Sequence, residues 1–147
     1  TTTPVKHFEK RPKKDMVEIM AAHKIPYVAN VSVAYPEDFV KKVQKALSME
    51  GFKFIHAFAP CPSGWKIKPE DTIKIAKLAV QSKIFPLYEV EYGVKYNLTV
   101  KVPNPVPVLD YLKLQGRFRH LTEEEINIIQ KGTDENWDLL MKKLENK

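Results

Sequence analysis

The sequence of 147 residues has few of the side chains from which catalytic and metal sites are most often built. It contains one cysteine, four histidines and five glycines. A single cysteine excludes an internal disulfide. The sequence also has no glycine-rich phosphate loop, no nucleophile elbow and no His/Cys cluster with zinc spacing. These absences argue against P-loop nucleotide hydrolases, serine hydrolases of the α/β type and zinc proteins.

Long apolar runs are also missing from the sequence. No run approaches the ~20 residues needed to cross a bilayer, which excludes a membrane-spanning helix, and no signal-peptide pattern is visible. Together with the single cysteine, this predicts a cytoplasmic protein. Because the chain begins at Thr1 without an initiator methionine, we expect it to be processed or partial.

The chain carries a net charge of +6, which is common among nucleic-acid-binding proteins and among lysine-rich enzymes. Its lysines are spread along the whole sequence, and the densest basic group is Lys10, Arg11, Lys13 and Lys14. No segment combines basic residues with interleaved aromatic residues. We therefore favour a solvated basic face over a nucleic-acid interface.

The strongest structural signal is a strand–helix–strand pattern. Residues 27–33 are rich in β-branched and aromatic side chains, and residues 52–59 form an apolar run that predicts a fully or nearly buried strand. Between them, residues 36–47 have the spacing of an amphipathic helix, with Pro36 at its first turn and Gly51 beyond its end. This pattern predicts a right-handed crossover and hence two parallel strands.

The lysines of this helix are predicted to face solvent: Lys41, Lys42 and Lys45. A further helix is predicted from Pro69, and a strand at residues 87–92 turns at Gly93 into an edge hairpin. The expected fold class is α/β: a three-layer α/β/α arrangement with a largely parallel sheet, an edge hairpin and a helical C-terminal tail.

A helix is also predicted near the start of the chain. Asp15 and Glu18 have the spacing of a capping box, in which each side chain caps the other's backbone. The helix should end near His23, because Pro26 follows. His23 could act as an acid–base group, but a histidine at a helix end more often compensates the helix dipole, and we favour that role.

Residues 103–147 are predicted to form a separate unit from residues 1–102. Alternating prolines give a stiff connector, and two short helices are predicted, from Thr122 and from Thr133. Three apolar side chains of the second helix are expected to be covered by a neighbouring chain or by a missing part of the protein, namely Trp137, Leu140 and Leu144. The tail is therefore expected to be a docking arm.

Cys61 is the one position where the sequence suggests chemistry. It follows the apolar run 52–59 and lies between Pro60 and Pro62, ahead of Gly64. A lone cysteine is usually a small buried apolar residue. The prolines and the glycine instead favour a rigid turn with backbone amides near the sulfur, which suits a ligand of an iron–sulfur cluster. Ligands also bind at the carboxyl ends of parallel strands.

Several segments, in order and at matching spacing, resemble the beta subunit of pyruvate:ferredoxin oxidoreductase and its 2-oxoacid relatives. They are residues 11–16, 21–23, 26–29, 32–39, 59–65 (APCPSGW) and 111–120 (YLKLQGRFRH). The resemblance covers essentially the whole chain. It is specific for the superfamily and less specific for the 2-oxoacid that is used.

The resemblance implies a thiamine diphosphate enzyme with Mg²⁺ that oxidatively decarboxylates a 2-oxoacid, forms an acyl-coenzyme A and passes electrons through 4Fe–4S clusters to ferredoxin. It implies alpha, gamma and delta subunits, or equivalent domains, as partners. In the family, the last cluster cysteine lies in the Ala-x-Cys turn, which is Cys61 here. The resemblance assigns no catalytic residue to this chain.

Two parts of the family pattern are absent from the sequence. One is the Gly-Asp-Gly motif of the diphosphate site, and the other is the set of remaining cluster cysteines, which precede these segments in the family. Residues 1–4 resemble the end of the loop that follows the diphosphate motif. We therefore expect the carboxyl-terminal half of a beta subunit. The alternative is a non-catalytic α/β module that binds a small ligand or another subunit.

Overall fold

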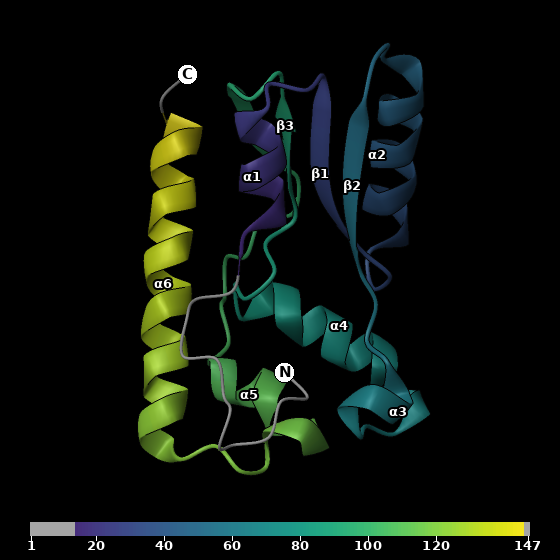
Figure 1. The fold of residues 1–147 in the computed structure, drawn as a ribbon. Coiled ribbons are helices and arrows are strands. Elements are labelled where there is room, and N and C mark those ends of the chain that lie inside the picture. Colours follow the sequence, from purple (N-terminus) through teal and green to yellow (C-terminus); the bar gives the residue numbers. More distant parts are fainter. Residues whose placement is uncertain (1–13, 146–147) are drawn as a thin grey trace.

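The computed structural model describes residues 14–145 (Figure 1). Residues 1–4 and the basic residues Lys10, Arg11 and Lys13 lie outside the described part. The helices are α1 (Met16–Ala22), α2 (Pro36–Ser48), α3 (Pro62–Trp65), η2 (Pro69–Asp71), α4 (Thr72–Gln81), α5 (Val108–Leu112), η3 (Gly116–Phe118) and α6 (Glu123–Glu145). The strands are β1 (Tyr27–Ser32), β2 (Lys53–Phe58), β3 (Tyr88–Glu91) and β4 (Lys95–Leu98).

The four strands form one sheet in the order β2-β1-β3-β4. β1 and β2 are parallel, with Tyr27 opposite Lys53 and Ser32 opposite Phe58, so the predicted crossover is confirmed. β3 pairs antiparallel with β1 and with β4. The predicted edge hairpin is thus confirmed, and within residues 14–145 the sheet is mixed, because the strand after α4 enters in the opposite direction.

Helices cover both faces of this sheet, which confirms the three-layer α/β arrangement. Val28 and Val90 face α1 and α6, where they pack with Val17, Ala21 and Leu140. Tyr27 and Ala29 face the other side and pack with Ala46 of α2. A third apolar cluster joins α4 and α5 below the sheet (Figure 1).

α1 begins as predicted, but its cap is only half of a capping box. Asp15 accepts hydrogen bonds from the amides of Val17 and Glu18. The Glu18 carboxylate turns away from Asp15 and accepts from Tyr96 and Lys143 instead. The helix ends at His23, which is exposed, as expected for a cap.

β2 is not the buried core strand that its apolar run predicted. Its residues are half-buried and Ala57 is exposed, whereas β1 is buried along its whole length. Within residues 14–145, no strand pairs with the second edge of β2. A strand at the edge of a sheet loses the cover that a neighbour on each side would give.

α6 is one helix of 23 residues, and the predicted break at Thr133 is wrong. Thr133 does not cap a new helix, because its hydroxyl donates to the Ile129 carbonyl one turn earlier. Leu140 is buried against α1 and the sheet, with Leu144 beside it. This chain itself buries Leu140, so the expectation that Leu140 needs a neighbouring chain is wrong. Trp137 and Leu144 are half-buried, and for them the expectation stays a prediction. The division of the chain at residue 102 stays a prediction.

Among residues 14–145, every helix is either too short or too polar to pass through a bilayer.

Candidate functional site

Cys61 lies where the sequence placed it, at the carboxyl end of a parallel strand. β2 ends at Phe58, Ala59 and Pro60 follow, and Cys61 is the N-terminal cap of α3. Pro60 cannot continue the ladder and Pro62 suits the first turn of a helix. The chain therefore leaves the sheet and turns at the cysteine. We call residues 60–66 the Cys61 turn.

Backbone hydrogen bonds close the Cys61 turn. The Trp65 amide donates to the Cys61 carbonyl at 2.9 Å, and the Ile67 amide donates to the Pro62 carbonyl at 3.0 Å. Lys66 ends the turn in the left-handed region, at φ 54°. At Gly64, a Cβ would lie 3.3 Å from the Cys61 sulfur. The glycine thus leaves room beside the thiol.

The Cys61 thiol is exposed to solvent, which contradicts the interpretation of this residue as part of the core. Hydrogen bonding to the Gly64 amide, together with the Ser63 side chain and amide, lowers the pKa of the thiol. The Ser63 hydroxyl lies 3.6 Å from the sulfur. Exposure and a lowered pKa both favour the thiolate, which is the form that binds metals.

One thiolate does not make a metal site. No group of three or more His, Cys, Asp or Glu side chains that could hold a metal ion occurs in the described part of the chain. A 4Fe–4S cluster takes four cysteine ligands. Cys61 fits such a cluster as a single ligand, and the others would have to come from outside residues 14–145.

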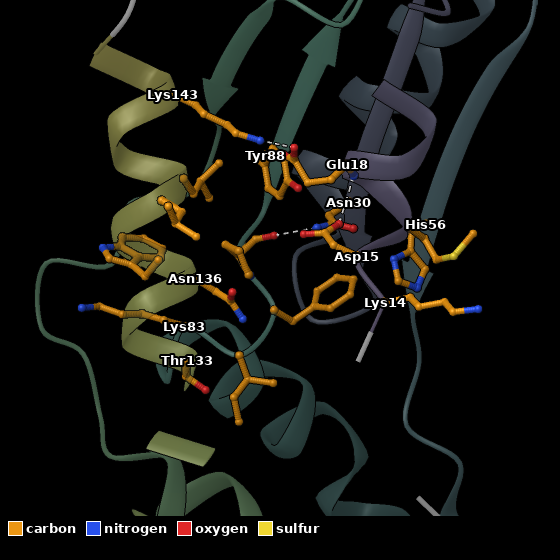
Figure 2. Close-up of a pocket in the computed structure, with 17 residues that line it drawn as sticks. Lys14, Asp15, Glu18, Asn30, His56, Lys83, Tyr88, Thr133, Asn136 and Lys143 are labelled. Carbon is orange, nitrogen blue, oxygen red and sulfur yellow. Dashed lines mark hydrogen bonds and ion pairs between the residues drawn. The ribbon is translucent and has the colours of Figure 1, made fainter. Parts of the chain in front are cut away.

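A separate cavity of about 360 Å³ lies between the sheet, the start of α1 and α6 (Figure 2). Its walls include Asn30 of β1, His56 of β2 and Trp137 of α6. The Asn30 amide group donates to the Pro86 carbonyl at 3.1 Å. The Asn30 Oδ1 atom is buried, and it is the one such side-chain oxygen or nitrogen without a hydrogen-bond partner in the described residues. It can accept a hydrogen bond from water.

His56 shares the wall of this cavity and is not near a metal-binding group of the described residues. Its ring is half-buried and packs edge-on against Phe85, with 5.3 Å between the ring centres. This position is that of a strand residue that packs partly in the interior.

On the opposite face of the sheet, a buried network of charges was not predicted from the sequence. Glu89 of β3 accepts hydrogen bonds from Lys45, Tyr27 and Asn97. Lys42 is 2% exposed, so its predicted place on the solvent face is wrong. Its ammonium group donates to the Asn30 carbonyl at 2.7 Å and to Asp38 at 2.8 Å.

The side chains of this network shift one another's pKa values. Burial raises the pKa of Glu89, but hydrogen bonds from Lys45, Tyr27 and Asn97 outweigh burial, so its net pKa is lowered. Burial lowers the pKa of Lys42, which Asp38 partly opposes. Each of these side chains has a hydrogen-bond partner, and we assign the network a structural role.

Comparison with known proteins gives the chain close relatives. No protein-family model matches it. It is 57% identical over 132 residues to pyruvate synthase subunit PorB of Methanocaldococcus jannaschii, a match that covers 90% of this chain and 44% of the relative. It is 50% identical over 147 residues to ketoisovalerate oxidoreductase subunit VorB of Pyrococcus abyssi, covering 97% and 47%. PorB of Methanosarcina barkeri is 48% identical over 144 residues, covering 92% and 48%.

The α/β fold and these relatives define the class: the chain is a homologue of oxidoreductase subunits. Its relatives PorB and VorB are the beta subunit of 2-oxoacid:ferredoxin oxidoreductase, so the resemblance stated from the sequence motifs is confirmed. The chain spans less than half the length of these relatives. Its place in the carboxyl-terminal half stays a prediction.

Proposed function

We propose that this chain is part of a 2-oxoacid:ferredoxin oxidoreductase, with pyruvate as the expected 2-oxoacid. Relatives at 57% and 48% identity are named pyruvate synthase subunits, and one at 50% is named a ketoisovalerate oxidoreductase subunit. In the proposed reaction, the bond between the first two carbons breaks and CO₂ leaves. The acyl carbon forms a thioester with coenzyme A, the thiol proton is released, and ferredoxin receives the electron pair.

The role proposed for this chain is to supply one ligand of a 4Fe–4S cluster, through Cys61. When bound, such a cluster accepts and passes on single electrons. The observation that carries the proposal is the exposed Cys61 thiol with a lowered pKa, in a turn that the backbone holds closed. The amides of Ser63 and Gly64 act on the same sulfur, and such donors tune a bound cluster.

Other cofactors and partners belong to the complete enzyme. Thiamine diphosphate, Mg²⁺, coenzyme A, ferredoxin and the alpha, gamma and delta subunits or equivalent domains are parts of the proposal. No residue of this chain is assigned to thiamine diphosphate, because the Gly-Asp-Gly motif of that site is absent from the sequence. No residue of this chain is proposed as catalytic.

The first prediction tests the ligand role with Cys61→Ser in the complete enzyme. We expect lower iron content, a changed electron paramagnetic resonance (EPR) spectrum of the reduced enzyme, and ferredoxin reduction slower by on the order of tenfold or more. Thiamine diphosphate binding should persist. Ser63→Ala is the matched control, because it removes a neighbour of the sulfur and no ligand.

Unaltered iron content and ferredoxin reduction in Cys61→Ser would refute the ligand role. A complete protein that contains neither iron nor thiamine diphosphate would refute the enzyme itself and would favour the non-catalytic module.

A further inference from the structure

Two segments that are far apart in the sequence meet at the Cys61 turn. They are α3, which follows the cysteine, and η3, which follows α5 at the same end of the molecule (Figure 1). The Gly116 amide donates to the Lys66 carbonyl at 3.1 Å. A Cβ at Gly116 would lie 2.7 Å from the Lys66 Cβ and 2.9 Å from the Lys66 oxygen. A glycine is therefore needed for this approach.

Arg117 makes the main side-chain contact between these segments. Its guanidinium carbon lies 3.6 Å from the centre of the Trp65 ring and 4.5 Å from that of Phe118. The Trp65 ring also packs on Phe58, the last residue of β2, with 5.6 Å between ring centres. A cation over an aromatic face is attracted to it, and the planar guanidinium favours a stacked orientation of the ring.

Arg117 also has polar contacts with Gln115 and with Tyr111 of α5. Its Nε donates to the Gln115 side chain at 2.9 Å, and its Nη2 lies 3.4 Å from the Tyr111 hydroxyl. Gln115 is buried and donates to the Tyr111 carbonyl at 2.7 Å. These contacts restrict the guanidinium, so Trp65 packs against a cation that is held in place.

The charge on Arg117 has no acidic partner within residues 14–145. The ion pairs of this part of the chain involve lysines, and none includes Arg117. Burial lowers the pKa of Arg117, which Tyr111 opposes, but a guanidinium stays protonated throughout the physiological range. A half-buried cation is thus held against the turn that presents the Cys61 thiol.

We propose that Arg117 is a positioning residue for the Cys61 turn: it fixes the turn by stacking on Trp65, and its positive charge favours an anionic, thiolate-ligated group there. This proposal rests on the proposed function, in which that group is a 4Fe–4S cluster. Reduction makes a cluster more negative, so a nearby cation stabilises the reduced state and raises the midpoint potential.

The test compares variants of the complete enzyme by EPR spectroscopy and redox titration of the cluster. In Arg117→Ala, we expect iron to be retained, the EPR spectrum of the reduced cluster to change and the midpoint potential to become more negative. Arg119→Ala is the matched control, since Arg119 is exposed and its side chain makes no ion pair or ring contact within residues 14–145. It should leave both quantities unchanged.

Arg117→Lys separates stacking from charge. Lysine keeps the charge and loses the planar stack, so we expect the potential to be largely restored and the spectrum to stay altered. If Arg117→Ala does not fold, Arg117→Lys alone tests the positioning role of Arg117. A wild-type EPR spectrum in Arg117→Lys would overturn the proposal.

The two proposals fail in different ways. If Cys61→Ser leaves the iron content unaltered, the ligand role itself fails. If Cys61→Ser removes the cluster signal while Arg117→Ala matches the Arg119→Ala control in spectrum and potential, the ligand role stands and the positioning role of Arg117 is overturned.

Discussion

β1 and β2 are neighbouring parallel strands of six residues with similar apolar sequences, yet their environments differ. All of β1 is buried, including polar Asn30 and Ser32. Most of β2 is half-buried, and the aromatic side chain of Phe52, just before it, is 61% exposed. The difference follows from position: β1 lies between two strands, and β2 has one neighbour in the described part of the chain.

The hydrogen bonds of β2 indicate which of its peptide groups face its open edge. The Phe58 carbonyl accepts from the Val33 amide of the chain beyond β1. In a parallel ladder, the peptide groups that face one neighbour alternate with those that face away. The peptide groups of Phe54 and His56 therefore face β1, and those of Ile55 and Ala57 face the open edge. An open strand edge with unpaired N–H and C=O groups is a template for pairing, so we expect a strand from outside residues 14–145 to pair here in a complete subunit.

The largest expected effect comes from placing a charge on each strand in turn. Val31 and Ala57 lie opposite each other, and Val31 is 0% exposed whereas Ala57 is exposed. Val31→Asp should cost about 4 kcal/mol or more, because it buries an unpaired carboxylate. Ala57→Asp should cost about 1 kcal/mol or less. Urea unfolding of this chain measures both, and equal losses would contradict the assignment of β2 as an exposed edge.

A second pair of variants tests the direction of the peptide groups in β2. His56→Pro removes an amide that faces β1 and should cost about 3 kcal/mol. Ala57→Pro removes an amide that faces the open edge and should cost about 1 kcal/mol in this chain. In a complete subunit, Ala57→Pro should become nearly as costly as His56→Pro. If Ala57→Pro stays mild there, no strand pairs with this edge.

Local signals in the sequence were enough to predict much of the fold. The strand, helix and strand of residues 27–59 were predicted correctly. The signals were Pro36, Gly51, the amphipathic spacing between them and the apolar composition of the two strands. The burial of β2 could not be predicted in this way, because the number of neighbours of a strand is decided by segments far away. At Thr133, a residue that resembles a helix cap follows a glycine, but packing on both sides continues α6 through it.

The candidate site, too, could be predicted only where the signal in the sequence is local. Pro60, Pro62 and Gly64 predicted a turn at the cysteine, and the structure has such a turn. The exposure of the thiol was not predicted. The contact of Arg117 with Trp65 carries no local signal, although both residues lie in segments that resemble the beta-subunit family. Lys42 was predicted to face solvent because helical periodicity places it away from the apolar stripe. The Asn30 carbonyl beneath it provides a buried acceptor that periodicity does not reveal.

The smallest effect is expected at the network that covers the other face of β1. Glu89 lies opposite Ala29 of β1 and is buried. Its folded-state pKa lies below the usual value of 4.5, since hydrogen bonds from Lys45, Tyr27 and Asn97 outweigh burial. A carboxylate with a lowered pKa contributes stability above its unfolded pKa and loses it as the pH falls through the folded value. The free energy of unfolding should therefore fall as the pH drops below 4.5.

Glu89→Gln tests this assignment. The variant should be less stable by about 1–2 kcal/mol at neutral pH, because a charge-assisted hydrogen bond from Lys45 is lost. The loss of stability below pH 4.5 should also become shallower than in the wild type. Glu124→Gln, on the exposed first turn of α6, is the control and should change both quantities by less, because an exposed carboxylate there interacts only weakly with the helix dipole. β2 has no comparable ion pair in the described residues. We therefore expect the loss of stability in acid to come from Glu89, beside β1, and not from β2. A Glu89→Gln variant that keeps the full wild-type slope in acid would place that dependence on other carboxylates.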